Sequence, residues 1–209
     1  MSTPEPGLRE LKKQMTHESI ANAALKLTLD KGLNNVTIDD IAHEAFVSPR
    51  TVSNYFASKE EAVLAAGTPD WFAVVEEFAE GPPTERPLAT LCELMSNFIR
   101  SRTREQLRLI VQTIELVDQH PTLHSLQTAA YDNLEEALRQ GVADRTGTDP
   151  NAHMYPWLVA AAAVSAIRSA LRLWAQSAAT ADRLPELVQD AFNQISDGLP
   201  ARLSAVQTH

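Results

Sequence analysis

Two side chains near residue 50 carry hydrogen-bonding groups that match the edges of DNA bases. The guanidinium of Arg50 can donate two parallel hydrogen bonds to guanine, and the amide of Asn54 can pair with adenine. The hydroxyls of Thr51 and Tyr55 suit phosphate oxygens, and Lys59 adds a positive charge nearby. Base edges are reached from the major groove, so the element that presents Arg50 and Asn54 must be narrow and exposed, as a single helix is.

Capping signals place these side chains on such a helix. Ser48 is a good N-cap, and Pro49 follows at the first helical position, where a missing N–H costs nothing. A capping-box pattern at Thr37 begins the preceding helix, and a second one at Ser58 begins the following helix. The helices that begin at Thr37 and Ser48 are both short and only a few residues apart. This spacing predicts a helix-turn-helix, whose second helix enters the major groove.

An earlier helix completes this first domain. Thr16 is predicted as its N-cap, and Gly32 as the residue that ends it. Residues 1–14 are expected to form a flexible arm in which Arg9, Lys12 and Lys13 are the only basic residues. The side chain of Phe56 is expected to be buried and that of Tyr55 exposed.

The stretch TIDDIAHEAFVSPRTVSNYFASKEEAVL resembles the DNA-binding domain of the TetR family of bacterial transcriptional regulators. The pattern SPRT-x-x-NYF resembles an actinobacterial subgroup of that family. The resemblance covers about residues 15–66, and several fixed spacings agree at once. It implies DNA contacts by Thr37, Ser48, Pro49, Arg50, Thr51, Asn54, Tyr55 and Lys59.

Two residues depart from the family pattern. Phe46 stands where the family usually has glycine in the turn, a position that often requires a positive φ. We expect either an adjusted turn, with a shifted recognition helix, or a strained Phe46. Ser53 stands where the family often has an aromatic residue, which predicts lighter packing there.

Composition limits the remaining classes of protein. The single cysteine excludes an intramolecular disulfide framework and a cysteine-based zinc cluster. The net charge of −9 argues against indiscriminate binding to nucleic acids or membranes. The longest apolar run, Trp157 to Val164, is too short for the roughly 20 residues of a membrane span, and the polar N-terminus does not look like a secretory signal. We therefore expect a cytoplasmic protein.

After Gly67-Thr68-Pro69 the sequence predicts helix after helix. The helix around residues 155–178 is apolar or small on two faces, which predicts core packing on one face and a homodimer interface on the other; a monomeric bundle is the alternative. The predicted interface residues are Ala162, Ser165, Ser169, Val188, Ala191, Phe192 and Ile195. The resemblance agrees, since the family dimerises through its last two helices. It also implies a pocket for a small effector, with Trp71, Met95, Phe98, Leu116, Tyr131 and Trp157 as candidates. The methionine and aromatic residues among them indicate an apolar effector.

The chain is thus expected to be all-α, with an arm at 1–14, a helix-turn-helix DNA-binding domain at 15–67 and a helical ligand-binding and dimerisation domain at 68–209. No catalytic constellation, metal site or cofactor is predicted, since Pro121 separates His120 from His124 and no third ligand is evident. The expected function is a homodimeric repressor that a small effector releases from double-stranded operator DNA. The alternatives are a helical ligand-binding protein whose DNA-binding residues have degenerated, and an all-α enzyme.

Overall fold

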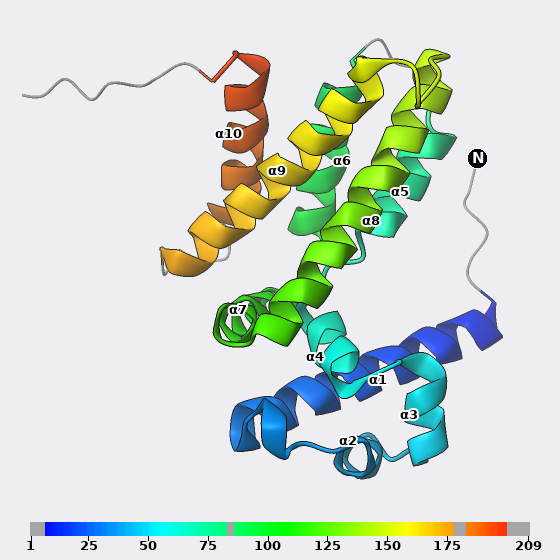
Figure 1. The fold of residues 1–209 in the computed structure, drawn as a ribbon, viewed down its shortest axis with the longest axis vertical. Coiled ribbons are helices and arrows are strands. Elements are labelled where there is room, and N and C mark those ends of the chain that lie inside the picture. The colour runs from blue at the N-terminus through cyan, green and yellow to red at the C-terminus, as the bar shows by residue number, and fades with distance from the viewer. Residues whose placement is uncertain (1–6, 83–85, 178–182, 200–209) are drawn as a thin grey trace, which may run out of the picture. The chain divides into compact units, whose positions relative to one another are not determined.

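The computed structural model describes residues 7–82, 86–177 and 183–199, and these ranges contain helices and no strand. Residues 1–6 of the expected arm and 200–209 of the expected second domain lie outside them. The all-α expectation is confirmed. In chain order the elements are α1 (Leu8–Lys31), η1 (Leu33–Asn35), α2 (Ile38–Glu44), α3 (Pro49–Tyr55), α4 (Lys59–Gly67), α5 (Trp71–Glu80), α6 (Pro87–Arg100), α7 (Arg104–Gln119), α8 (Pro121–Thr146), α9 (Met154–Gln176) and α10 (Leu184–Ser196) (Figure 1).

The helices pack into two compact units that are not contiguous in the sequence. Unit 1 contains the chain up to Pro69 together with Thr103–Ala130, and unit 2 contains Asp70–Arg102 together with the chain from Tyr131 onward. Packing therefore adds α7 and the first part of α8 to the helices of the predicted DNA-binding domain. The chain passes between the units three times, the last time within α8.

The predicted caps of α2, α3 and α4 are confirmed, but the capping box predicted at Ser58 is not completed, because the carboxylate of Glu61 accepts from the N–H of Ala57. The side chain of Thr37 accepts a hydrogen bond from the N–H of Asp40 and completes a capping box. Ser48 caps α3 with Pro49 in its first turn, and the hydroxyl of Ser58 accepts from a backbone N–H in the first turn of α4. These caps set where each short helix begins.

The predicted start of the first helix is wrong. Helix α1 begins at Leu8, and the hydroxyl of Thr16 donates to the carbonyl of Lys12 within the helix instead of capping it. The reason is that the segment between Gly7 and Thr16 holds Leu, Arg, Glu, Lys and Gln, which all favour helix, and no residue that would stop one. Residues 8–14 of the expected arm are therefore helical.

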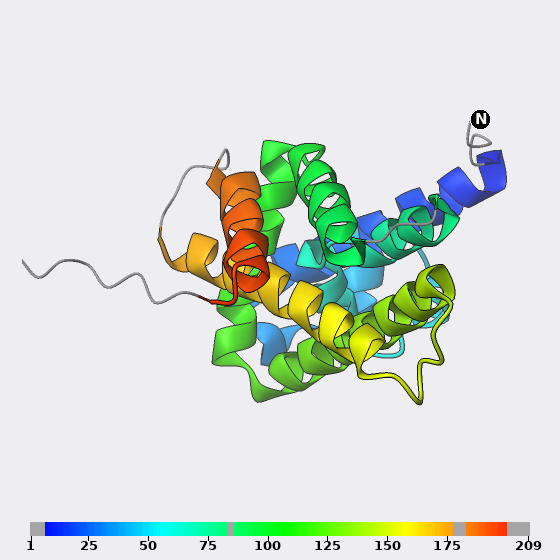
Figure 2. The ribbon, with the colours of Figure 1, turned by 90° about the horizontal axis from the view of Figure 1, so that it is seen from above.

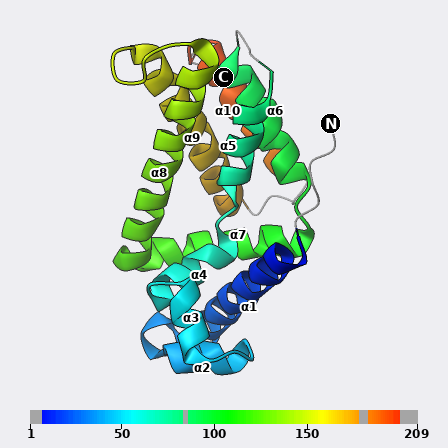
Figure 3. The ribbon, with the colours of Figure 1, turned by 90° about the vertical axis from the view of Figure 1, so that its right-hand side faces the viewer.

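The core of unit 1 joins α1 to α4 and α4 to α7 (Figures 1 and 3). Ile20, Ile41 and Val63 are fully buried there, and Val52 anchors α3 to the same cluster. Leu116 and Val117 of α7 and Leu123 of α8 complete the cluster. The helix that carries Arg50 and Asn54 is thus held by a core to which residues far along the chain contribute.

Unit 2 contains α5, α6, α9 and α10, and α10 lies beside both α9 and α6 (Figure 2). Met95, Ile167 and Phe192 lie in its buried interior. Among the described helices, α9 alone is long and apolar enough to cross a membrane, but half of its most apolar window is buried inside the structure. Such burial is typical of the central helix of a globular unit.

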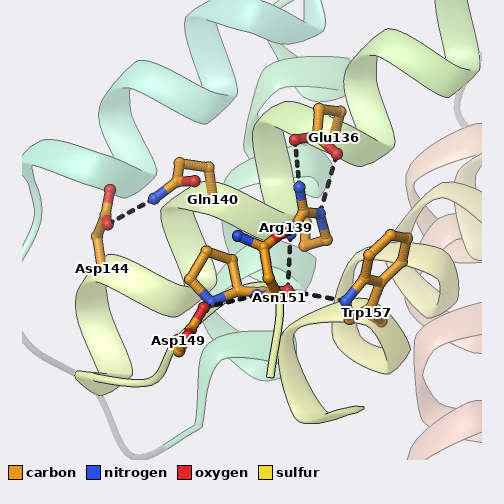
Figure 4. Close-up of polar contacts among 8 residues, drawn as sticks. Glu136, Arg139, Gln140, Asp144, Asp149, Asn151 and Trp157 are labelled. Carbon is orange, nitrogen blue, oxygen red and sulfur yellow. Dashed lines mark hydrogen bonds and ion pairs between the residues drawn. The ribbon is translucent and has the colours of Figure 1, made fainter. Parts of the chain in front are cut away.

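A polar cluster holds the link between α8 and α9 (Figure 4). The guanidinium of Arg139 donates to both carboxylate oxygens of Glu136 and, at 2.7 Å, to the carbonyl of Pro150. The same carbonyl accepts from the indole N–H of Trp157 at 2.8 Å, and Arg139 stacks on the Trp157 ring. Because Arg139 is buried and its guanidinium N–H groups are already hydrogen-bonded, this cluster stabilises the structure of unit 2.

Gly67 allows a close contact between the end of α4 and α7. A Cβ at this position would lie 2.2 Å from Oγ1 of Thr113 and 2.4 Å from the carbonyl oxygen of Leu109, both on α7. We predict that Gly67→Ala destabilises the protein by about 1–3 kcal/mol, because α4 and α7 must separate. Thermal unfolding should show a midpoint lowered by several degrees.

Gly141→Ala is the matched control. This glycine also lies within a helix, but its Cβ would meet only Phe78 at 3.4 Å, an ordinary contact distance. Alanine favours helix over glycine, so the variant should be neutral or up to about 1 kcal/mol more stable. Equal losses of stability in both variants would contradict the close-contact explanation.

Candidate nucleic-acid interface

One side of α3 faces solvent and carries the residues predicted to read bases. Pro49, Arg50 and Asn54 are exposed, while Val52 on the opposite side is fully buried. The hydroxyl of Ser48 accepts from the backbone N–H of Thr51 at 3.0 Å and lies 2.8 Å from the Thr51 hydroxyl. The helix therefore presents Arg50 and Asn54 outward from a capped first turn.

Thr37 and Asp40 form a closed pair at the start of α2. The backbone N–H and the hydroxyl of Thr37 both donate to the carboxylate of Asp40, at 3.0 and 2.8 Å. These hydrogen bonds, the hydroxyl's first, lower the pKa of the Asp40 carboxyl. A lowered pKa means that the stabilisation is complete above the ordinary carboxyl range and is lost only as the pH falls through the lowered value. The carboxyl group of Asp40 is therefore ionised at neutral pH, and its hydrogen bonds with Thr37 are intact.

Lys59 has a structural role that the sequence did not reveal. Its ammonium donates to the carbonyls of Leu33 and Val36, at 2.8 and 2.9 Å, and its side chain is partly buried. These carbonyls belong to η1 and the residue after it, so Lys59 ties the first turn of α4 to the segment just before α2. Only one of its three ammonium protons remains for a phosphate.

Tyr55 lies next to the beginning of α1. Tyr55 lines a hollow of about 580 Å³ together with Arg9, Lys12, Lys13 and Thr16. The imidazole of His17 packs between this region and the core, with its centre 4.5 Å from that of the buried Phe56 ring. Tyr55 itself is half-buried, whereas the sequence predicted it exposed.

We call Arg9, Lys12 and Lys13 the basic cluster. The sequence assigned them to a flexible arm, and their position became visible only because α1 extends to Leu8. The spacing of three to four residues between Arg9 and the lysines was the available signal, since it places them on one side of a helix. Three positive charges beside a tyrosine hydroxyl suit a phosphate backbone.

The turn between α2 and α3 contains an unusual residue. Phe46 has a φ of +57°, in the left-handed region, as the departure from the family glycine predicted for an unadjusted turn. Its side chain is 95% exposed. Ser53, the second departure, is exposed, and its hydroxyl donates to the carbonyl of Pro49.

Comparisons with known proteins agree with this architecture. The model of the bacterial regulatory proteins of the tetR family matches residues 20–66, and that of the MftR C-terminal domain matches residues 85–200. The transcriptional regulator TcmR of Streptomyces glaucescens is 30% identical over 98% of this chain and 92% of its own length. The chain belongs to the TetR family.

Two further relatives extend the comparison. MftR of Mycobacterium tuberculosis is 27% identical over 90% of this chain and 93% of its own length. The crystal structure of a TetR-family protein from Syntrophomonas wolfei has a TM-score of 0.62 at 18% identity, covering 91% of this chain and all of that one, and so shares its fold. As a TetR-family protein, the chain is a DNA-binding transcriptional regulator.

Of the six residues predicted to line an effector pocket, five lie in unit 2. The rings of Trp71 and Phe98 lie 5.1 Å apart, on α5 and α6, and Met95 is fully buried. The indole N–H of Trp71 is buried without a hydrogen-bond partner. Tyr131 is mostly enclosed, and burial raises the pKa of its hydroxyl although Arg168, which stacks on its ring, opposes the shift.

The other two candidates take different positions. Leu116 lies in the core of unit 1, so the structure does not place it in one unit with the rest. Trp157 is 45% exposed and belongs to the Arg139 cluster. Both are apolar residues on amphipathic helices, and the sequence pattern alone does not distinguish core, surface and pocket.

The residues predicted to form a dimer interface differ in burial: some lie at the surface and others lie in the core of the chain. Ser165 and Ser169 are exposed, and Ala162, Ala191 and Ile195 are half-buried. Val188 and Phe192 are fully buried within the chain, where α10 packs on α6 and α9.

We predict that Lys59→Met lowers stability as well as DNA affinity. The substitution keeps the aliphatic chain but leaves the carbonyls of Leu33 and Val36 without their donor, at a cost of about 1–3 kcal/mol. The unfolding midpoint should fall together with affinity for every DNA sequence.

Arg50→Met is the control, because Arg50 is exposed and makes no hydrogen bond or ion pair with the residues that the structure describes. It should leave the unfolding midpoint unchanged. A Lys59→Met protein as stable as the wild type would show that the two carbonyl bonds contribute nothing.

Proposed function

We propose that this TetR-family protein is a homodimeric repressor that binds its operator through α3 and the basic cluster and leaves it when a small, apolar effector binds in unit 2. The observation that carries the proposal is the exposed side of α3, where Arg50 and Asn54 face solvent beside a hollow with three positive charges. On a chain with a net charge of −9, such a cluster favours one surface for DNA over all others.

The proposed contacts divide by their chemistry. Arg50 and Asn54 contact base edges, and Pro49 packs close to them at the start of the helix. Thr37, Ser48, Thr51, Tyr55 and Lys59 contact the sugar–phosphate backbone, and the basic cluster extends this backbone contact beyond α3. Base contacts determine which sequence is bound, and backbone contacts determine how affinity depends on salt.

Two variants separate these roles. Against DNA from the region beside the protein's own gene, Arg50→Ala should cost about 1–3 kcal/mol and relax preference at one base position. Replacing Arg9, Lys12 and Lys13 with Gln should weaken all sequences alike. It should also lower the slope of log affinity against log salt by about two to three, because three phosphate contacts are lost.

The control for the triple variant is Lys26→Gln, a lysine of the second half of the same helix that pairs with Glu44, and neither residue is among the proposed DNA contacts. It should change neither the affinity nor the salt slope by a comparable amount. Sequence-independent losses from Arg50→Ala would reject base reading by Arg50. A wild-type protein without sequence preference in the absence of effector would favour the alternative in which the DNA-binding residues have degenerated.

Dimerisation is proposed through the solvent-facing side of α9. Leu158 and Leu173 are more than half exposed there, with the small residues Ala162, Ser165 and Ser169 between them. From α10, Ala191 and Ile195 add to this surface, while Val188 and Phe192 support it from beneath. Exposed leucines are typical of an interaction surface, and the small residues between them allow two helices to approach closely. Sedimentation at micromolar concentration should give twice the 23.0 kDa mass of the chain, and a 23.0 kDa species would contradict the proposal.

The effector site is proposed around Trp71, Met95 and Phe98, with Tyr131 as a further candidate. A buried N–H without a partner costs about 1–3 kcal/mol, so an acceptor on a bound ligand would stabilise it. The neighbouring residues are aromatic and apolar, which favours an apolar ligand with one acceptor group.

The proposed coupling is geometric. A palindromic operator requires the two recognition helices of a dimer to lie roughly 34–36 Å apart. Helix α4 leads out of the DNA-binding domain, and its tilt is set by the close contact with α7 at Gly67. A ligand that favours another tilt of α4 would change the spacing of the recognition helices. Coupling of about 1–3 kcal/mol would weaken operator binding roughly 5- to 150-fold, and the operator would weaken effector binding equally.

This reciprocity gives the test. A panel of fatty acids and aromatic compounds should include one that dissociates the operator complex, and its affinity should fall when operator DNA is saturating. Trp71→Phe should bind DNA normally but respond to that compound about tenfold less well, since the indole N–H is lost. Identical effector affinities with and without DNA would mean that the sites are not coupled.

A further inference from the structure

Phe46 has two features that are unfavourable in the folded protein, and no contact within the protein compensates for them. Its φ of +57° places a bulky residue in the left-handed region, where Cβ crowds the backbone. Its ring is 95% exposed, so folding buries almost none of its apolar surface. Glycine would remove both disadvantages. Strained residues that persist in this way occur most often at functional sites.

The surrounding backbone holds Phe46 firmly in this conformation. Its N–H donates to the carbonyl of His43 at 3.2 Å, and the N–H of Val47 donates to the carbonyl of Ala42 at 2.9 Å. Ala45 is buried before it, and Val47 packs against the core after it. The turn therefore keeps the geometry that glycine usually provides, and the side chain has no contact role in the folded domain.

The position of this ring relates it to the DNA-binding side. Phe46 lies two residues before Ser48, the N-cap of α3. The turn to which it belongs joins α2 to α3, which lie side by side in Figure 3. Two residues span at most about 7 Å of chain. The ring is therefore within reach of whatever the first turn of α3 contacts.

We propose that the ring of Phe46 packs against apolar surface of the operator DNA beside the first turn of α3. The inference rests on the proposed DNA contacts of α3. Such surface comes from two sources, the methyl group of thymine in the major groove and the carbon atoms of deoxyribose. Contact with the methyl group or with deoxyribose buries the exposed ring only when DNA is bound. This explains why the ring does not stabilise the free protein.

A protein partner fits the surroundings less well. Between Leu29 and Phe72 in the sequence, Phe46 is the only large apolar side chain that is exposed. The exposed residues that follow it in the chain include Ser48, Pro49 and Arg50, which suit DNA. A single ring among polar groups is typical of a DNA-contacting surface more than of a protein interface.

The test compares Phe46→Gly with Phe46→Tyr on the DNA used for the wild type. Phe46→Gly should unfold at the same temperature as the wild type or a few degrees higher, because the strain is relieved. It should bind the operator about 5- to 30-fold more weakly, with an unchanged salt slope, because an apolar contact is lost and no counterion is involved. Phe46→Tyr keeps the ring and should bind within about twofold of the wild type.

Replacing operator thymines one at a time with deoxyuridine distinguishes the two sources. Sensitivity of the wild type but not of Phe46→Gly at one thymine identifies the methyl group, and equal insensitivity at every position identifies deoxyribose. The proposal is overturned if Phe46→Gly binds the operator as tightly as the wild type, or if it changes self-association instead of DNA affinity. A wild type that fails to bind any DNA would instead overturn the proposed function.

Discussion

A helix of seven residues makes too few internal hydrogen bonds to be stable alone, so α3 depends entirely on what holds its ends and its buried side. The hydroxyl of Ser48 caps one end. Val52 inserts into the core of unit 1 at the middle, and Phe56 is buried just after the other end. The orientation of Arg50 and Asn54 is a consequence of these three anchors, and neither side chain contributes to its own placement.

The local features of this arrangement could be predicted from the sequence because they depend on residues close together in the chain. The caps at Thr37, Ser48 and Ser58 follow from short-range hydrogen bonding, and the positive φ of Phe46 was one of the two alternatives expected for the turn. The start of α1 could not be predicted from Thr16, because the run of good helix formers before it outweighs the low helix propensity of one threonine.

Contacts between residues far apart in the chain could not be predicted from the sequence, for a different reason. Nothing near Lys59 indicates that its ammonium meets the carbonyls of Leu33 and Val36, since that contact depends on how α4 packs. In the same way, Leu116, Trp157 and Phe192 all lie on amphipathic helices, and only tertiary packing assigns them to a core or a surface. Periodicity shows that a residue is on an apolar face, but not what that face covers.

The shared core of unit 1 limits how such a protein can be divided or recombined. Leu116, Val117 and Leu123 complete the core of the DNA-binding helices, yet they lie some 50 residues beyond Gly67 in the sequence. A fragment that ended at Pro69 would expose the apolar surface that these residues cover. Transplanting the DNA-binding helices into a chimeric regulator would therefore require a matching α7 and the beginning of α8. The unit that can be transferred to another protein is defined by its packing, and it is made of two segments that are separate in the sequence.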